Sequence, residues 1–302
     1  MKKYSSQGIK EFFSKPIFDE KGILNKDPSW PRISIVTPSY NQAQFLERTI
    51  LSVLNQNYPN LEYIIIDGGS TDGSIKIIKK YEKYFAYWIN EKDKGQADGI
   101  NKGFKKATGD IFTWLNSDDI YLPNTLFKIA EVFTKYPNVD VIYGNQIDIN
   151  EKDEIIGEMI NTYWIPFISE LGFKYGGFGF HQPASFWRKE IFFGSGLLNP
   201  GLHFCMDIDM FIRFILNNAK FKYVREYFAC FRHHQNSKTS RLQYLAKKEI
   251  QEIYNKYKIN TKGITICKNI VRISKPIFYL LQGDILWYLQ MIFKKLIKKY
   301  KK

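Results

Sequence analysis

Two adjacent carboxylates, Asp118 and Asp119, closely follow the apolar run Ile111–Leu115. Adjacent negative charges repel each other unless a cation or hydrogen-bond donors compensate them. A hard divalent cation compensates such a pair well, since Mg²⁺ usually binds one or two carboxylates together with ligand phosphates and water. Taken alone, the pair is equally typical of a helix-capping turn before Leu122–Asn124. The residue types therefore leave a metal site and a helix cap open at this position.

The chain contains neither G-x-x-x-x-G-K-[ST] nor G-x-G-x-x-G, so it would not bind the phosphates of a ligand through a P-loop or a dinucleotide loop. This absence also weighs against a nucleotidyltransferase, which likewise uses paired carboxylates and a metal. Such an enzyme would normally carry a Gly-rich phosphate loop near the first strand, and Thr37–Gln44 (TPSYNQAQ) contains no glycine.

Short β-branched runs alternate with helical patterns along the first half of the chain. Strands are predicted at Arg32–Thr37, Leu61–Asp67, Tyr84–Asn90, Ile111–Leu115 and Val139–Gly144, and helices at Phe45–Leu54, Ser74–Tyr81, Ala97–Ala107 and Asn124–Tyr136. This alternation predicts an α/β fold with a doubly wound, mostly parallel sheet and helices on both faces. Ligands of such sheets bind beyond the carboxyl ends of the strands. We therefore expect Thr37–Asn41, Asp67 and Asn116–Asp119 to meet at one edge.

Two stretches, Thr37–Ser74 and Asp93–Pro123, resemble the nucleotide-binding half of the family 2 glycosyltransferases, which are inverting enzymes with the Rossmann-like GT-A fold. The resemblance extends from Ile33 to about Ser240. In that family, the loop after the first strand and the aspartate that ends the second strand hold the nucleotide base and ribose. The resemblance assigns these roles to Thr37, Pro38, Tyr40 and Asp67.

The metal-binding D-x-D motif of the family matches Asn116-Ser117-Asp118, and this sequence departs from the motif at Asn116. The resemblance thus implies a divalent metal, Mn²⁺ or Mg²⁺, on Asp118, with Asp119 contributing through water and Asn116 bonding the ribose. It also implies that Asp98 and Asn101, in GQADGINKG, lie near the donor sugar. The alternative for these two residues is an ordinary exposed helix. A UDP-linked sugar is the donor that the family's habit favours.

Downstream, His181–Phe186 and Cys205–Met210 match the acceptor half of the family. The match implies that His181 and Gln182 contact the acceptor. The family's Glu-Asp pair falls on Met206-Asp207, which assigns the general base to Asp207. What the missing glutamate contributes is then absent or supplied elsewhere. From the residues alone, Asp207 also fits a helix N-cap before an apolar run.

Two further groups accompany these motifs. We expect Asp209 to form an i,i+4 ion pair with Arg213. Arg232–Lys238 resembles the loop that closes over the diphosphate in the family, which implies that His234 completes the metal shell or touches phosphate. The alternative is that His233 and His234 form a solvent-facing pair.

The net charge of +14 is concentrated at one end of the chain. Residues 241–302 hold 15 Lys and Arg against three acidic residues, a net of +12, which leaves +2 for residues 1–240. A nucleic-acid-binding domain usually shows its basic face within the fold, so no nucleic-acid partner is expected. A basic extension on a near-neutral domain favours an anionic membrane surface. Apolar residues at helical spacing precede its terminal lysines: Phe278, Leu281, Ile285, Leu289, Ile292 and Leu296. The alternative is a helix packed on the core.

The cysteine usage and the N-terminus favour a cytoplasmic protein, either free or peripheral on the inner face of the membrane. Three cysteines without a C-x-x-C pair make a disulfide framework or a zinc site improbable. The first 15 residues contain no apolar core typical of a secretory signal, and Gln282, Asp284 and Gln290 interrupt the least polar stretch, which argues against a transmembrane helix.

We therefore predict three parts: a lead-in at 1–31, a GT-A domain at 32–240 and a basic helical extension at 241–302. Within the domain, 32–145 would bind the nucleotide sugar and 146–240 the acceptor. The expected function is transfer of a hexosyl or N-acetylhexosaminyl group from a nucleotide-diphosphate sugar to an acceptor hydroxyl on a saccharide or lipid-linked saccharide, in surface polysaccharide or glycolipid synthesis. The alternative is a catalytically inactive nucleotide-sugar-binding assembly or regulatory subunit, which Met206 and Asn116 keep open.

Overall fold

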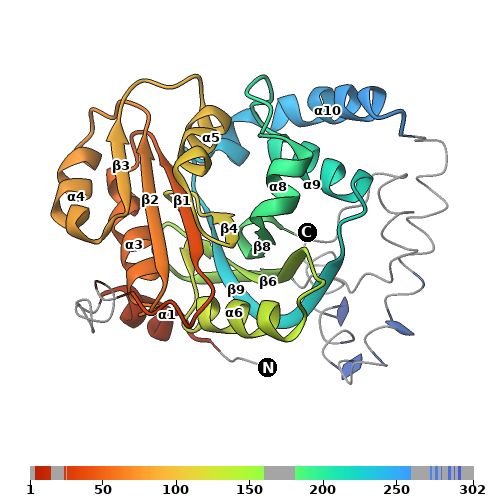
Figure 1. Ribbon diagram of the computed structural model, residues 1–302, viewed down its shortest axis with the longest axis horizontal. Coiled ribbons are helices and arrows are strands. Elements are labelled where there is room, and N and C mark those ends of the chain that lie inside the picture. Colours follow the sequence, from red (N-terminus) through yellow and green to blue (C-terminus); the bar gives the residue numbers. More distant parts are fainter. Residues whose placement is uncertain are drawn as a thin grey trace. The chain divides into compact units, whose positions relative to one another are not determined.

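The computed structural model of the chain describes residues 4–14, 24, 26–159 and 181–259, together with scattered positions between 273 and 293. Tyr4–Asn161 and Phe180–Ile253 form one compact unit, and the sheet lies within it. Figure 1 labels the helices and strands of this unit.

The first half of the sheet is parallel, as its alternating sequence predicts. Its strands are β1 (Ile33–Ser39), β2 (Leu61–Asp67), β3 (Tyr87–Asn90) and β4 (Ile111–Trp114), in the order β3-β2-β1-β4. Ser39 pairs with Asp67, and Val36 pairs with Trp114. The carboxyl ends of the three inner strands therefore open at the same edge.

The second half of the sheet mixes parallel and antiparallel pairs. It comprises β5 (Ile120–Tyr121), β6 (Val141–Asn150), β7 (Ile155–Met159), β8 (Ser185–Arg188) and β9 (Phe221–His233), and the order continues β4-β8-β6-β9-β5, with β7 also on β6. β6 and β9 run parallel, whereas β8 runs antiparallel to β4 and β6. The short strand β5 pairs antiparallel with β9, so that Ile120 lies opposite Cys230.

Helices cover both faces of the parallel half (Figure 1). On one face, α3 (Ala43–Leu54) and α4 (Ser74–Tyr81) pack against alternate residues of β1 and β2, Ile35 and Ile65 among them. On the other face lies α5 (Gln96–Lys106), so close that a Cβ on Gly103 would stand 2.4 Å from a Val36 methyl. Adjacent residues of a strand point to opposite faces, and every residue of β1 and β2 is buried, so both faces of these strands are covered. The predicted α/β fold is confirmed.

Among the described residues, the second half of the unit has three further helices, and α10 follows them. They are α6 (Thr125–Lys135), α8 (Lys189–Ser195) and α9 (Met206–Leu216). Helix α10 spans Lys238–Lys256 and so crosses the domain boundary predicted at 240/241.

Three segments differ from the sequence prediction. The irregular lead-in contains α1 (Ser6–Ser14), whose Ile9 and Phe13 are buried against the domain. A nine-residue helix is marginal by itself, so tertiary packing stabilises it rather than a pattern readable in the sequence. The predicted strand at Tyr84–Asn90 begins only at Tyr87, since Glu82–Tyr84 forms a 3₁₀ turn, and the strand predicted at Val139–Gly144 continues to Asn150.

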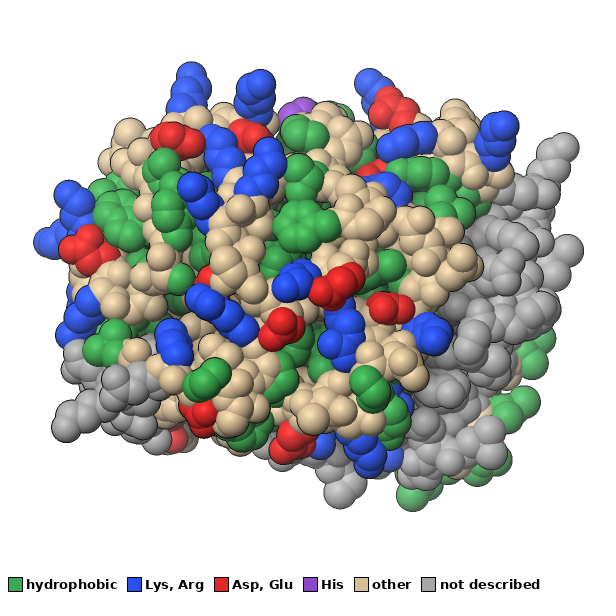
Figure 2. Space-filling view, in the orientation of Figure 1, with side chains coloured by type: hydrophobic (Ala, Val, Ile, Leu, Met, Phe, Trp, Pro, Cys, Tyr) green, Lys and Arg blue, Asp and Glu red, His purple; other side chains and the backbone are tan. Residues whose placement is uncertain are grey.

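The surface and the extension are consistent with the uneven charge of the chain. Lys and Arg side chains alternate with Asp and Glu over the described part of the face in Figure 2, in keeping with a net charge of +2 for residues 1–240. No helix among the described residues is both long and apolar enough to cross a membrane. Phe278, Leu281 and Leu296 of the predicted membrane-surface helix lie outside the described residues. That helix therefore stays a prediction.

Candidate active site

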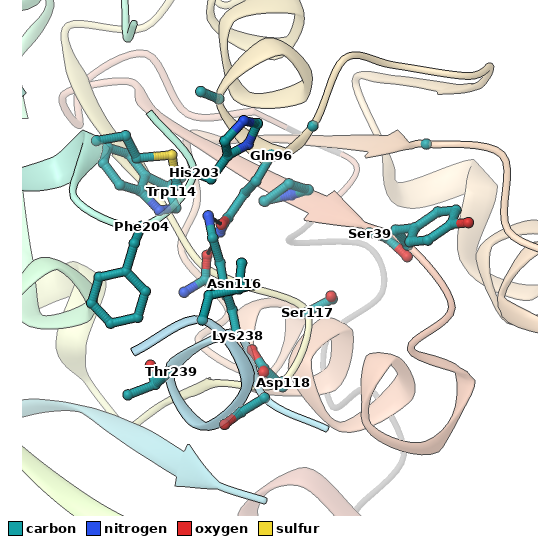
Figure 3. A pocket seen from close by; sticks show the side chains of 18 of the residues that line it. Ser39, Gln96, Trp114, Asn116, Ser117, Asp118, His203, Phe204, Lys238 and Thr239 are labelled. Carbon is teal, nitrogen blue, oxygen red and sulfur yellow. Dashed lines mark hydrogen bonds between the residues drawn. The ribbon is translucent and has the colours of Figure 1, made fainter. Parts of the chain in front are cut away.

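A pocket of about 830 Å³ opens at the carboxyl ends of the parallel strands. Its walls combine the loops that follow β1, β2 and β4 with the start of α9 and the start of α10: Pro38, Tyr40, Gly68, Gly69, Asn116, Ser117, Asp118, Asp207 and Lys238 are among the lining residues. The volume suits a small-molecule ligand. The structure thus brings together the loops that the strand pattern placed at one edge. Figure 3 shows Asn116 and Lys238 between Ser39 on one side and Trp114 and Phe204 on the other.

Asp67 shapes the turn after β2. It is fully buried, and its Oδ1 accepts hydrogen bonds from the backbone N–H groups of Gly69 at 3.1 Å and Ser70 at 2.8 Å. Its Oδ2 accepts the Ser70 hydroxyl at 2.7 Å. The pocket wall at this point is formed by Gly68 and Gly69, so Asp67 shapes the pocket through the turn that it fixes.

The loop after β1 divides between core and pocket. Thr37 is fully buried, and its hydroxyl lies 3.1 Å from the hydroxyl of Tyr63, so this predicted site residue does not line the pocket. Pro38 and Tyr40 do line it, and Tyr40 is 63% exposed. An exposed aromatic ring at the mouth offers a stacking surface for a nucleobase.

Both polar atoms of the Asn116 side-chain amide form hydrogen bonds within the protein. Its Oδ1 accepts from the Gln96 side chain at 2.6 Å, and its Nδ2 donates to Asp119 Oδ2 at 3.1 Å. The Gln96 amide in turn accepts from Lys238 Nζ at 2.5 Å. These contacts form one hydrogen-bonded chain that links α10, α5 and the loop after β4.

Asp119 lies behind the pocket rather than in it. It is 1% exposed, and its Oδ1 accepts the backbone N–H of Arg232 at 2.9 Å. Burial, together with the charge of Asp118, raises the pKa of the Asp119 carboxyl well above its usual range. Asp119 does not line the pocket, so its metal role through water stays a prediction.

Asp118 lines the pocket, and its carboxylate meets His234, which does not line the pocket. Its Oδ2 lies 3.0 Å from Nε2 of His234, whose ring packs at 4.7 Å on Phe45. The His234 side chain is 3% exposed, whereas that of His233 is 48% exposed. The alternative of two solvent-facing histidines is therefore wrong for His234. His234 follows β9 and Asp118 precedes β5, so the pairing of β9 with β5 places the two residues close together.

Asp98 and Asn101 bond to the protein instead of reaching the pocket. Asp98 accepts the Lys94 N–H at 3.1 Å at the start of α5 and lies 3.7 Å from Lys102 Nζ. The buried amide of Asn101 donates to and accepts from the backbone of Leu198, at 2.8 and 2.9 Å. Neither lines the pocket, so their proximity to a donor sugar stays a prediction.

Asp207, in the first turn of α9, also lines the pocket. Burial raises the pKa of its carboxyl, and the Lys238 ammonium partly opposes this rise. A carboxylate with a raised pKa in a pocket is a candidate proton acceptor. The predicted partner of Asp209 is confirmed: Arg213 Nε donates to its Oδ2 at 2.9 Å.

Of the two residues predicted to contact the acceptor, only Gln182 lines the pocket. Gln182 lines the pocket and donates to the Trp114 carbonyl at 2.6 Å. His181 does not line it, and burial lowers the pKa of its imidazole. His181 instead contributes its carbonyl, which accepts the Ser185 hydroxyl at 2.8 Å.

A profile comparison now assigns the fold and the motifs to a family. Residues 34–213 match the family described as Glycosyl transferase family 2. The chain belongs to this family. The match includes strands β2 and β4, nearly all of β1, and the first turn of α9 with Asp207.

Curated relatives of this family 2 protein are also named glycosyltransferases. An uncharacterized glycosyltransferase of Rickettsia typhi is 36% identical over 196 residues, which is 61% of this chain and 59% of the relative. Another, from Haemophilus influenzae, is 44% identical over 101 residues, which is 32% of this chain and 40% of the relative. The matches therefore span less than two thirds of these relatives' own length.

Solved structures agree on the fold. The TarS fragment 1–349 of S. aureus with UDP-GlcNAc matches with a TM-score of 0.57 at 15% identity, over 84% of this chain and 80% of that one. The mannosyltransferase PcManGT of Pyrobaculum calidifontis, with GDP-Man and Mn²⁺, matches with a TM-score of 0.56 at 16% identity, over 95% and 81%. At these identities the similarity concerns the fold alone, and it confirms the GT-A architecture.

The fold implies a divalent metal, and in this family 2 protein Asp118 is the pocket carboxylate that fits one, with His234 beside it. Within the described residues no three His, Cys, Asp or Glu side chains cluster as a complete metal site. Mg²⁺ and Mn²⁺ do not require such a cage, because substrate phosphates and water complete the shell around one or two protein ligands. Asp118 supplies a carboxylate oxygen in the pocket, and the imidazole of His234 lies 3.0 Å from it.

The sequence did not point to several pocket residues, among them Lys238, Gln96 and Asp93. Lys238 is half-buried in the pocket wall, although it stood in the sequence only as the end of the loop that resembles the family's mobile loop. Gln96 and Asp93 also line the pocket. Both lie in the stretch Asp93–Pro123 that carries the resemblance. The residue type of Gln96 does not indicate a site residue by itself, and its role becomes visible only from its hydrogen bonds to Lys238 and Asn116.

Proposed function

We propose that this chain transfers a sugar from a nucleotide-diphosphate sugar to an acceptor hydroxyl, with inversion at the anomeric carbon. The observation that carries the proposal is one pocket lined both by the loops after β1, β2 and β4 and by Asp207. A donor and an acceptor bound there would have a carboxylate beside the reacting hydroxyl.

On the donor side, Tyr40 and the Gly68–Gly69 turn would hold the base and ribose, and Asp118 with His234 would hold the metal. When bound, the metal would stabilise the charge that develops on the departing diphosphate. Lys238, a half-buried cation in the same wall, would add positive charge near the phosphates.

On the acceptor side, Asp207 would take the proton from the attacking hydroxyl. The raised pKa of its carboxyl makes its ionised form a stronger base than an ordinary aspartate. A positioned general base contributes roughly 10²–10⁴-fold to rate. One displacement with the base opposite the leaving group inverts the configuration.

The donor nucleotide is proposed to be UDP, with a hexosyl or N-acetylhexosaminyl group. Structures of this fold have been solved with UDP-GlcNAc and with GDP-Man, so both nucleotides belong in the test. The acceptor is proposed to be a saccharide or lipid-linked saccharide of surface polysaccharide or glycolipid synthesis. The basic extension at 241–302, with a net charge of +12, would hold the protein on the anionic inner face of the membrane.

The first experiment is calorimetric titration of UDP and of GDP into the full chain, with Mn²⁺ and again with excess EDTA. We expect metal-dependent binding of one nucleotide. No binding of either would remove the proposal. A panel of sugars on the nucleotide that binds then identifies the donor by release of the free nucleotide, with water as the acceptor.

Asp207→Asn tests the base. We expect turnover to fall by at least about 10²-fold, while the Kd for the nucleotide is unchanged. Asp209→Asn is the matched control, because it removes a carboxylate from the same turn whose partner is Arg213 and which does not line the pocket. It should lower stability and leave turnover intact. Binding without turnover in the unaltered chain would favour the inactive-subunit alternative.

A further inference from the structure

The turn that leads into α9 is held by a carboxylate from a different helix. Three successive backbone N–H groups, of His203, Phe204 and Cys205, donate to Glu249 of α10 at 2.8, 2.8 and 2.7 Å. Cys205, the N-cap residue of α9, makes no side-chain capping hydrogen bond of its own. Successive N–H groups that converge in this way form a concave anion site, and here a side chain of the same protein occupies it.

The position of this anchor connects it to the reaction. Glu249 is 5% exposed, so its carboxylate is held away from water. His203 and Phe204, which it holds, line the pocket and are seen together at one wall in Figure 3. Asp207 follows the last anchored residue, Cys205, by two positions and lies in the first turn of α9. A shift of the turn would therefore move the carboxylate of Asp207 as well as the wall.

We propose that Glu249 is a positioning residue for the reaction: by anchoring the His203–Cys205 turn it holds Asp207 at the acceptor side of the pocket. The inference rests on the proposed function, because it takes Asp207 as the base. Glu249 lies beyond residues 34–213, so the family match does not include it. Helix α10 is in this sense part of the site, contributing Lys238 at its first turn and Glu249 farther along.

The anchor needs a carboxylate rather than an amide. Oε1 of Glu249 accepts the His203 N–H, and Oε2 accepts those of Phe204 and Cys205. A glutamine has one accepting oxygen, so in either orientation its NH₂ group would face at least one N–H donor. Glu249→Asp keeps the charge and both oxygens but withdraws them by one methylene.

Glu249 also acts on the charge of the base. The groups that influence Asp207 are the Ile208 N–H on its own helix, and Lys238 and Glu249 on α10. Burial is the largest cause of the raised pKa of Asp207, and the negative charge of Glu249 adds to it. Because Asp207 must be ionised to accept a proton, Glu249→Gln should move the acid limb of turnover to lower pH. Glu249→Asp should leave the limb in place.

The test compares Glu249→Gln and Glu249→Asp with Glu252→Gln, an exposed carboxylate on the same helix whose partner is Lys248 at 3.9 Å. Hydrogen–deuterium exchange of the full chain reads the anchor directly, without any substrate. Turnover is read as nucleotide release from the donor found in the panel, from pH 4 to 9 (about the range over which carboxylates and histidines titrate). UDP or GDP titration reads the donor side.

We expect faster amide exchange at 203–207 in Glu249→Gln, an unchanged nucleotide Kd, and a kcat lower by about 10- to 100-fold, as a misplacement near 1 Å produces. Glu252→Gln should match the unaltered chain in all three. Exchange at 203–207 and a pH limb that do not move would overturn the proposal, as would both Glu249 variants losing nucleotide binding through unfolding. If the unaltered chain binds neither nucleotide, the proposed function has failed, and the exchange result then still reports on the anchor alone.

Discussion

Arg232 allows a controlled test of what holds the Asp118 loop, because two arginines share one carboxylate and only one of them is buried. Arg232 Nη1 pairs with Oδ1 of Asp153, and Arg48 Nη1 pairs with Oδ2 at 3.1 Å. The Arg232 side chain is 0% exposed and that of Arg48 is 35% exposed. We predict that Arg232→Met lowers the free energy of unfolding by about 3–5 kcal/mol, whereas Arg48→Met lowers it by about 1 kcal/mol or less.

The difference follows from the other contacts of the Arg232 guanidinium. It donates to the backbone carbonyls of Asp118 at 2.8 Å and Asn150 at 3.0 Å, and it packs on the ring of Phe45 at 4.9 Å. Each buried carbonyl left without a donor costs about 1–3 kcal/mol, and a desolvated cation–π contact is worth about 2 kcal/mol. Asp153 keeps one arginine partner in either variant: Arg48 in Arg232→Met and Arg232 in Arg48→Met. The excess cost of Arg232→Met therefore comes from the two carbonyls and the ring.

The assay is urea unfolding of the full chain, with the slope of the transition compared among variants. Since one of the released carbonyls belongs to Asp118, nucleotide affinity with Mn²⁺ should also fall in Arg232→Met, by about tenfold, the equivalent of about 1.4 kcal/mol. Arg48→Met should leave it unchanged. If the two variants unfold within about 1 kcal/mol of each other, the buried guanidinium does not hold the loop and the reasoning is wrong.

Three other predictions concern single charges. Asp118→Asn should weaken nucleotide and metal binding together, so that titrations with Mn²⁺ and with EDTA give similar weak binding; retained metal dependence would place the ion elsewhere. Lys238→Met removes the positive charge that lowers the pKa of Asp207, so the acid limb of turnover should move to higher pH. Burial works against ionisation of Glu62, but hydrogen bonds, first among them that of the Ser34 hydroxyl, outweigh it and lower the pKa of this carboxyl. It therefore stabilises the fold above about pH 4.3 and ceases to do so as pH falls through its lower folded pKa. Glu62→Gln should cost about 2 kcal/mol at pH 7, with a smaller difference in acid unfolding; equal loss at pH 3 and pH 7 would contradict the charge argument.

The sequence predicts the parallel half of the sheet well because its signals are local. Leu61–Asp67 and Ser74–Tyr81 have the bounds that β-branched composition and helical spacing indicate. Pro38, Tyr40 and Asp118 line the pocket because strand ends in a parallel sheet share an edge. For these residues, position along the strand is sufficient to predict position in space.

The remainder depends on contacts between distant segments. β5 has two residues and exists by pairing with β9, so no pattern announces it. Thr37 alternates into the core, where the Tyr63 hydroxyl meets it, although the neighbouring residue faces the pocket. Asn101 satisfies its amide on Leu198, in a loop that the sequence leaves without a predicted structure. In each case a residue type suited to ligand binding is used to tie two segments together.

Asn116 shows why the departure from the D-x-D motif belongs to this pocket. Its amide accepts from Gln96 and donates to Asp119, which a carboxylate at the same position could not do. A carboxylate there would place a second negative charge about 3 Å from Asp119, whose pKa burial and Asp118 already raise. The neutral amide instead completes a series of hydrogen bonds from Lys238 through Gln96 to Asp119. These bonds connect the start of α10 to the loop that carries Asp118. Where the family motif has a carboxylate, this chain has an amide that connects Gln96 of α5 to the loop that carries Asp118 and Asp119.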